Sequence, residues 1–465
     1  MPATTLDQIV SLAKRRGFVF PGSEIYGGLA NTWDYGPLGI ELKNRVQKLW
    51  WKRFVRSRQD MVGLESGILM NPKVWEASGH VGNFGDPLVD CKKCKQRFRG
   101  DKLIEEKIGV EAAAILKLDQ VQPMLMAEKI ACPNCKSVDW TVAKKFSLMF
   151  KTEQGVIEGE GNDIYLRPET AQGMFVDFKN IAGSMRKRLP FGIAQVGTVF
   201  RNEITPGNFT FRTREFQQME IEYFIQPGTE GEHFEQWKKD MWQWCMDIGL
   251  SPERLRVREH TKEELSHYSS RTLDIEYMYP WGWGELYGLA NRSDFDLTQH
   301  EKFSGQDLKY VDPEDPKNKF LPYVVEPTFG LTRTVLALLL EAYGEEKVAE
   351  DDVRTVLKFA PGIAPVDVAI LPLSKKEHLS AKAQEVYKKI VQETDLNVDY
   401  DFTGSIGKRY RRQDEIGTPK CITVDFGTLG EDAEQGAKDT VTIRDRDTLK
   451  QERVSIGELI AKLKN

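Results

Sequence analysis

FRNEITPGNFTFRTREFQQMEIEYF, residues 200–224, alternates like a β-hairpin but carries three arginines and four glutamates. Pro206, Gly207 and Asn208 are typical turn residues and separate the two expected strands. Because side chains alternate between the two faces of a strand, the second strand is expected to have one apolar, core-facing side. That side consists of Met219, Ile221, Tyr223 and Ile225.

The opposite face of the expected hairpin is polar. On the first strand, Arg201 and Glu203 are predicted to share a face with Val199, and Arg212 and Arg214 follow just after the turn. On the second strand, the polar face carries Phe216, Gln218, Glu220 and Glu222. One interpretation is a solvated surface, whose ion pairs contribute only about 0–1 kcal/mol each. The other is a polyanion site, in which arginines bind phosphate, carboxylates hold those arginines or an amine, and an aromatic ring supports a base.

A second segment favours the polyanion site. VEPTFGLTRTVLALLLEAYG, residues 325–344, predicts the end of a strand, a glycine and an amphipathic helix. The expected buried stripe of that helix is Leu331, Val335, Leu338, Leu339 and Ala342. Arg333 falls in its first turn, at the positive end of the helix dipole, where a cation is unfavourable unless an anion binds there too. A purely structural arginine is the alternative.

The composition is that of a globular protein of 465 residues, which suggests about two to four domains. The net charge of -5 does not favour nucleic acid, so any such contact must come from a local basic patch such as KRYRRQ at 408–413. That run can also be an ordinary solvated loop. No apolar run approaches the roughly 20 residues of a membrane helix. The N-terminal segment reads as an amphipathic helix and not as a secretory signal, so we expect a cytoplasmic protein.

Composition shifts divide the chain. Residues 86–145 are rich in lysine and enclose a predicted helical stretch over 101–119, which indicates an inserted module. FAPGIAPVDVAILPL, residues 359–373, begins as a Pro/Gly-containing linker, and a small α/β domain of about 100 residues is expected after it. The expected units are 1–85, 86–145, 146–360 and 361–465.

The insert holds four of the six cysteines as two CxxC pairs, Cys91/Cys94 and Cys132/Cys135. In a reducing compartment such pairs are more often zinc ligands or redox motifs than disulfides. Two knuckle-like turns favour a structural zinc ion bound by four thiolates. A vestigial or metal-free insert is the alternative, and a redox role is least expected because neither pair opens a thioredoxin-like unit.

Several segments together resemble the class II aminoacyl-tRNA synthetases. FRNE with the downstream REF resembles motif 2, and GLTR at the start of an apolar helix resembles motif 3. YGPLGIELKNRVQKLWWKRFV, leading to NPKVWEASGH, resembles motif 1, the helix and strand of the dimer interface. Within the class, RGFVFPGSEIYGG, LRPETAQGMF, GWGELYGLANRSDFDL and VVEPTFGL are similar to blocks of the homodimeric glycyl-tRNA synthetases. The similarity spans nearly the whole chain.

The resemblance implies an α+β fold. It comprises a catalytic domain on an antiparallel sheet, the zinc-knuckle-like insert and a C-terminal α/β anticodon-binding domain. The implied reaction joins glycine and ATP into glycyl-adenylate with release of pyrophosphate, and then transfers glycine to tRNA(Gly) with release of AMP. The implied partners are glycine, ATP, Mg²⁺, tRNA(Gly) and a second copy of the chain.

The resemblance also assigns ATP contacts. Arg201, Glu203 and Arg333 are the expected catalytic residues, on the α-phosphate, the adenine and the region of the γ-phosphate. Phe216 is expected under the adenine, and Glu285 is expected to hold magnesium. The full expected ATP site is Arg201, Asn202, Glu203, Phe211, Arg212, Arg214, Phe216, Glu285, Leu286, Gly330 and Arg333.

For glycine, the resemblance makes Glu220 the carboxylate that binds the amino group. The full expected substrate site is Arg99, Glu169, Phe216, Gln218, Glu220, Glu326, Thr328 and Gly330. A pocket that admits only hydrogen at Cα rejects larger amino acids by overlap. Thr328 stands where the family pattern has serine, and FRGDK stands for the more usual FRADH around Arg99. The basic run 408–413 is expected to contact the anticodon stem-loop.

Three other functions remain open at this point. The chain could activate another amino acid, such as proline or threonine. It could be an accessory nucleic-acid-binding protein, but such proteins commonly lose the ATP arginines, whereas Arg201 and Arg333 are present. It could adenylate without tRNA, which the expected C-terminal α/β domain disfavours.

Overall fold

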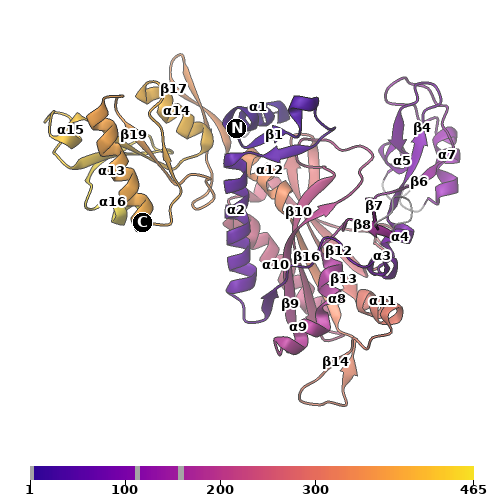
Figure 1. The fold of residues 1–465 in the computed structure, drawn as a ribbon. Coiled ribbons are helices and arrows are strands. Elements are labelled where there is room, and N and C mark those ends of the chain that lie inside the picture. Colours follow the sequence, from indigo (N-terminus) through magenta and orange to yellow (C-terminus); the bar gives the residue numbers. More distant parts are fainter. Residues whose placement is uncertain (1–4, 110–115, 156–161, 465) are drawn as a thin grey trace.

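The computed structural model describes residues 5–109, 116–155 and 162–464 (Figure 1). A central body surrounds a seven-stranded sheet, with the cysteine-containing insert on one side and the C-terminal α/β unit on the other. The sheet has the order β11-β12-β13-β16-β10-β9-β3, and only β3 runs parallel to its neighbour. In this order the strands are Leu255–Glu259, Arg271–Tyr279, Gly282–Ser293, Tyr323–Gly330, Glu215–Ile225, Phe191–Phe200 and Met61–Gly63.

The predicted hairpin is β9 and β10, and its apolar face is confirmed. Met219, Ile221, Tyr223 and Ile225 all lie in the main hydrophobic core. The prediction that Arg201 and Glu203 lie on the first strand is wrong, because β9 ends at Phe200. The Glu203 N–H donates to the Arg201 carbonyl at 2.7 Å, so the chain bends away from the ladder there. Residues 201–214 form a connecting loop, in which Asn208 and Phe209 adopt left-handed backbone conformations (φ 55° and 56°).

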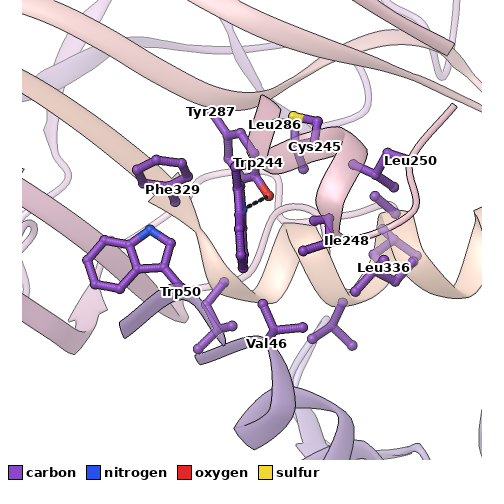
Figure 2. Packing of buried hydrophobic residues seen from close by; sticks show 14 of the residues in the cluster. Val46, Trp50, Trp244, Cys245, Ile248, Leu250, Leu286, Tyr287, Phe329 and Leu336 are labelled. Atoms are coloured by element: carbon purple, nitrogen blue, oxygen red, sulfur yellow. Dashed lines mark hydrogen bonds between the residues drawn. The ribbon is translucent and has the colours of Figure 1, made fainter. Parts of the chain in front are cut away.

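Three helices pack against the core face of the sheet: α2 (Pro37–Trp51), α10 (Glu230–Asp247) and α12 (Leu331–Ala342). The motif 3 helix prediction is confirmed, and its expected stripe is buried. Figure 2 shows how Trp244 of α10 stands between the sheet and the helices, with its indole N–H donating to the Tyr287 hydroxyl at 3.2 Å. This hydrogen bond satisfies the polar atom of a buried aromatic side chain. The helix α2 continues as a π-turn, Lys52–Arg56, into β3.

The opposite face of the sheet is covered by α8 (Ala171–Val176), α9 (Phe178–Ser184) and α11 (Phe295–Ser304) (Figure 1). Phe224 of β10 belongs to this second core, with Phe191 and Ile193 of β9. The polar face of the hairpin is therefore apolar at its far end and polar near the loop 201–214.

The insert has its own small core. Strands β4 (Gly85–Asp90), β5 (Arg97–Arg99) and β6 (Lys144–Ser147) form a three-stranded sheet under the helices α5 (Gly100–Ile108) and α7 (Leu118–Ala127). The predicted helical stretch 101–119 is thus helical at both ends, and residues 110–115 lie outside the described residues.

The C-terminal unit is a five-stranded α/β layer of order β20-β19-β21-β22-β23. In chain order its elements are β19 (Val368–Pro372), α13 (Glu377–Glu393), β20 (Val398–Tyr400), α14 (Ile406–Ile416), β21 (Lys420–Val424), α15 (Phe426–Leu429), β22 (Thr440–Asp445), β23 (Gln451–Ser455) and α16 (Leu459–Lys464). The loop interpretation of the basic run is wrong, because 408–413 lies inside α14. Arg409 is buried there and donates to the carbonyls of Phe402 and Gly404, both at 2.8 Å.

The Pro/Gly-containing segment interpreted as a linker is packed against the central body. Ile363 and Ala364 are buried in the main core. Before it, β17 (Tyr343–Ala349) and β18 (Asp352–Leu357) form a hairpin that the sequence did not predict. Arg354 of this hairpin is 1% exposed, donates to the Arg446 carbonyl at 2.9 Å and lies 3.3 Å from the Asp414 carboxylate. Central body and C-terminal unit therefore meet through a buried polar contact.

The N-terminal helix α1 confirms the prediction of an amphipathic helix, and it opens with a capping box between Thr5 and Gln8. Most of the remaining elements are short. They are α1 (Leu6–Arg16), β1 (Val19–Pro21), η1 (Glu24–Tyr26), β2 (Trp33–Tyr35), α3 (Pro72–Ala77), α4 (His80–Asn83), β7 (Lys151–Gln154), β8 (Asn162–Tyr165), η3 (Pro252–Arg254), β14 (Tyr310–Val311) and β15 (Lys319–Phe320). Within the described ranges, none of the helices combines the length and apolarity needed to cross a bilayer.

Candidate active site

A cleft opens where the loop 201–214 meets β10, β13, β16 and the start of α12. It brings together most of the predicted ATP residues, from four separate stretches of sequence. Its lining consists of Arg201, Glu203, Phe211, Arg212, Thr213, Phe216, Gln218, Glu285, Leu286, Thr328, Gly330, Thr332 and Arg333. Thr213 and Thr332 were not predicted.

Arg201 is held between aromatic rings. Its guanidinium carbon lies 5.3 Å from the ring centroid of Phe216 and 5.4 Å from that of Phe84. Its Nε donates to the Pro168 carbonyl at 3.1 Å. A guanidinium fixed in this way binds phosphate with little further loss of side-chain entropy.

Arg333 lies on the other side of the cleft, over the ring of Phe211 at 4.5 Å. Its Nη1 donates to the Glu285 carbonyl and lies 3.0 Å from the Glu285 carboxylate. The positive charge of Arg333 lowers the pKa of Glu285, whose side chain is half exposed to the cleft. Glu285 is therefore available as an ionised oxygen ligand.

Glu203 and Arg212 form the end of the cleft nearest the insert, and Oε2 of Glu203 lies 3.7 Å from Nη1 of Arg212. Behind them Arg99 pairs with Asp86 at 2.9 Å and with Asp101 at 2.6 Å. Burial raises the pKa of Asp86 to about 6 against the opposing charge of Arg99. Arg99 is thus already paired with two carboxylates and does not line the cleft.

Glu220 lies deeper than the cleft and is 2% exposed. Its Oε2 accepts hydrogen bonds from the backbone N–H of Thr170 at 3.1 Å and from the Thr170 hydroxyl. Its Oε1 accepts from the Thr328 hydroxyl at 3.0 Å. Burial and then the charge of Glu169 raise the pKa of Glu220. Because Thr328 also lines the cleft, it connects the arginine-lined surface to this carboxylate.

A buried arginine that the sequence reasoning missed organises the other carboxylates. Arg292 donates to both oxygens of Asp296, at 2.7 and 2.9 Å, and to Glu326 at 2.8 Å. It also lies 3.6 Å from Glu169, and Glu169 lies 3.4 Å from His80. Although burial opposes it, the charges of His80 and Arg292 lower the pKa of Glu169. The signal was present in NRSDFD, since Arg292 and Asp296 are four residues apart where β13 leads into α11.

Two predicted ATP residues lie elsewhere. Arg214 donates to the Ala30 carbonyl at 3.1 Å and lines a neighbouring groove with Trp33 and Lys43. Asn202 is not in the lining, and its backbone N–H donates to the Leu148 carbonyl at 2.8 Å. ATP contact by either residue stays a prediction.

The four insert cysteines converge. One sulfur atom from each of Cys91, Cys94, Cys132 and Cys135 lies within 4.8 Å of the others. Lys95 and Lys136 adopt left-handed conformations (φ 60° and 61°), so each CxxC turn curls its two thiols inward. Four sulfur atoms about 2.3 Å from a tetrahedral zinc ion would be about 3.8 Å apart. The thiols therefore fit a structural zinc ion.

Comparison with known proteins agrees with this geometry. Residues 150–343 match the model of the tRNA synthetase class II core domain (G, H, P, S and T), and residues 367–465 match that of the anticodon binding domain. A glycine–tRNA ligase of Clostridium kluyveri is 57% identical over 98% of this chain and 97% of its own. That of Geobacillus thermodenitrificans is 56% identical over 99% and 97%, and that of Clostridium acetobutylicum 56% over 98% and 97%.

Proposed function

Since this chain belongs to the glycine–tRNA ligase family, we propose that it attaches glycine to tRNA at the expense of ATP in the charged cleft. The observation that carries this proposal is the joining of two sites by Thr328. One is a phosphate-binding surface with Arg201 and Arg333, and the other is a buried carboxylate, Glu220.

In the first step a carboxylate oxygen of glycine attacks the α-phosphorus of ATP. A P–O bond forms to glycine, the bond from the α-phosphorus to the bridging oxygen breaks, and pyrophosphate leaves. This step needs positioning and positive charge more than a general base. Arg201 binds the α-phosphate and Arg333 the terminal phosphates. Phe216 stacks under the adenine, whose edge contacts Glu203.

The remaining ATP contacts are proposed from the cleft lining and from the family resemblance. They are Asn202, Phe211, Arg212, Arg214, Glu285, Leu286 and Gly330. When bound, Mg²⁺ would neutralise phosphate charge, and the ionised Glu285 is the residue proposed to hold it.

Glycine is proposed to bind with its ammonium group on Glu220, between the cleft and the buried carboxylates. The single positive charge of Arg292 does not neutralise all the buried carboxylates around it, and a positively charged ligand would compensate the remaining negative charge. The other proposed substrate contacts are Arg99, Glu169, Phe216, Gln218, Glu326, Thr328 and Gly330. Beside Glu220, the Thr328 methyl group narrows the space for any side chain on the substrate.

In the second step the terminal adenosine of tRNA(Gly) takes glycine from the adenylate, and AMP leaves. The match of 367–465 to the anticodon binding domain supports an anticodon contact by the C-terminal unit. We further propose a structural Zn²⁺ on the four cysteines, a homodimer through α2 and β3, a cytoplasmic location and the domain limits 1–85, 86–145, 146–360 and 361–465.

Glycine-dependent exchange of labelled pyrophosphate into ATP tests the first step. Arg201→Ala should lower kcat/KM about 100-fold or more, because one charge-stabilising donor is lost. Arg188→Ala, an exposed arginine paired with Glu314 far from the cleft, is the matched control and should keep wild-type exchange. Exchange with proline or alanine but not with glycine would overturn the proposal.

A further inference from the structure

Behind the glycine pocket, Glu222 and Glu326 face each other across two neighbouring strands. In the register of β10 and β16, Glu220 pairs with Thr328 and Tyr223 with Val325, which places Glu222 opposite Glu326. One carboxylate oxygen of each of Glu220, Glu222 and Glu326 lies within 4.8 Å of the other two. Glu222 is 0% exposed and Glu326 6%. Like charges in directly opposed positions destabilise a sheet.

The hydrogen bonds around this pair are unequal. Glu326 accepts from Arg292 through Oε1, and Glu220 has the three hydrogen bonds described above. Neither oxygen of Glu222 has a hydrogen-bond partner among the described residues. Its opposite residue on β9 is Ile193, which offers no donor side chain. A buried ionised carboxylate without donors is far too costly to keep, so the group takes up a proton instead.

The charges facing Glu222 lead to the same conclusion. Arg292 is the cation nearest to the pair, and its donors already bind Asp296 and Glu326. Burial, and then the charge of Glu326, raise the pKa of Glu222 well above its usual value. Burial also raises the pKa of Glu326, but the charge of Arg292 opposes this shift and its hydrogen bond favours the ionised form of Glu326, which leaves the proton to Glu222. The charged and titratable groups of this region are Glu220 (β10), Glu326 (β16), Arg292 (β13), Asp296 and His300 (α11), Glu169 (before α8), His80 (α4) and Tyr268.

We propose that Glu222 is a neutral carboxylic acid in the working enzyme and that its O–H donates to Glu326. A proton fits between Glu222 and Glu326 better than a metal cation does, because the guanidinium of Arg292 already lies against Glu326 and would repel a metal cation. Glu222 is then a positioning residue. It holds the Glu326 carboxylate against Arg292, and through it the wall of the glycine pocket. This functional role rests on the proposed glycine site, whereas the protonation state does not.

Infrared difference spectroscopy on the full-length enzyme with ¹³C-labelled glutamate tests the protonation state. Wild type near neutral pH should show the C=O stretch of a protonated carboxyl group, and Glu222→Gln should lack it. The inference is overturned if wild type lacks this band or if the band persists in Glu222→Gln.

Pyrophosphate exchange with the same variants tests the positioning role. Glu222→Gln keeps a neutral donor of the same shape, so its KM for glycine should stay near the wild-type value. Glu222→Leu cannot donate, so its KM for glycine should rise about tenfold while its KM for ATP is unchanged. A glycine KM raised equally in both variants would mean that an ionised Glu222 is needed, which overturns the inference. If wild type itself shows no exchange with glycine, the proposed function fails and the infrared result still stands.

Discussion

At the scale of single residues, Thr328 joins the cleft to Glu220 and thereby to the proposed glycine pocket. Thr328→Ser keeps the hydroxyl that donates to Glu220, so glycine activation should change little. Thr328→Val keeps the shape but leaves an oxygen of a buried carboxylate without its donor, which costs about 1–3 kcal/mol. The KM for glycine in pyrophosphate exchange should therefore rise about 5- to 150-fold in the valine variant only. A loss in the serine variant but not in the valine variant would assign the effect to packing of the methyl group.

Glu222 also predicts a pH-dependent stability. Its pKa is raised on folding, so above the unfolded pKa the folded state holds a proton that the unfolded chain lacks. The stability contributed by that proton is therefore complete at low pH and is lost as pH rises towards the raised folded pKa, by about 1.4 kcal/mol per pH unit. The Tm of Glu222→Gln, relative to wild type, should thus increase as pH rises above the unfolded glutamate pKa of about 4.3. Glu232→Gln, an exposed position on α10, is the control and should show no such trend.

Sequence alternation predicted which side chains of β10 face the core, because period two follows from strand geometry alone. It could not predict the partners of those side chains. The opposition of Glu222 and Glu326 depends on the pairing of two strands about 100 residues apart, and the bonds from Arg292 to Glu326 depend on a third strand. Arg201 was predicted in the right cleft but on the wrong kind of element, because a strand pattern does not reveal where the ladder ends.

At the scale of elements, the insert should depend on its metal. The core of the insert is small, and all four cysteines belong to it or pack against it. Removal of zinc by a chelator should therefore open residues 86–145 to limited proteolysis, while the seven-stranded sheet stays protected. Cys94→Ser should do the same without chelator, and elemental analysis should find about one zinc per chain in wild type. Cys245→Ser, outside the insert, is the matched control and should keep both zinc and protease resistance.

The basic run 408–413 shows why composition alone misjudges an element. Charged residues suggested a solvated loop, but Ile406 and Tyr410 pack towards the sheet of the C-terminal unit, and Gly417 ends the helix in a left-handed conformation. The i and i+4 spacing of Ile406 and Tyr410 was a helical signal. The burial of Arg409 against backbone carbonyls could not be predicted from the sequence, since those carbonyls belong to a turn that forms only in the folded unit.

At the scale of the whole molecule, tRNA binding should depend on the exposed cations of α14 and not on the buried one. Lys408→Ala should weaken tRNA binding and reduce the slope of log K against log salt by about one, because one phosphate contact is lost. Filter binding over a salt series measures both effects. Arg409→Ala should instead lower the Tm of the C-terminal unit, since it removes a buried side chain together with its hydrogen bonds to the Phe402 and Gly404 carbonyls. An unchanged salt slope in Lys408→Ala would remove α14 from the tRNA interface.

The Arg354 contact has a consequence for how far apart the two ends of a bound nucleic acid can be. A guanidinium bonded to the Arg446 carbonyl and close to the buried Asp414 carboxylate resists sliding, since a shift would separate these buried polar groups, while Glu346 of the same hairpin stays bonded to Arg354. We therefore expect the hairpin β17–β18 to help fix the distance between the C-terminal unit, whose proposed role is anticodon binding, and the cleft. A nucleic acid of the wrong length is then expected to contact one of these two surfaces but not both.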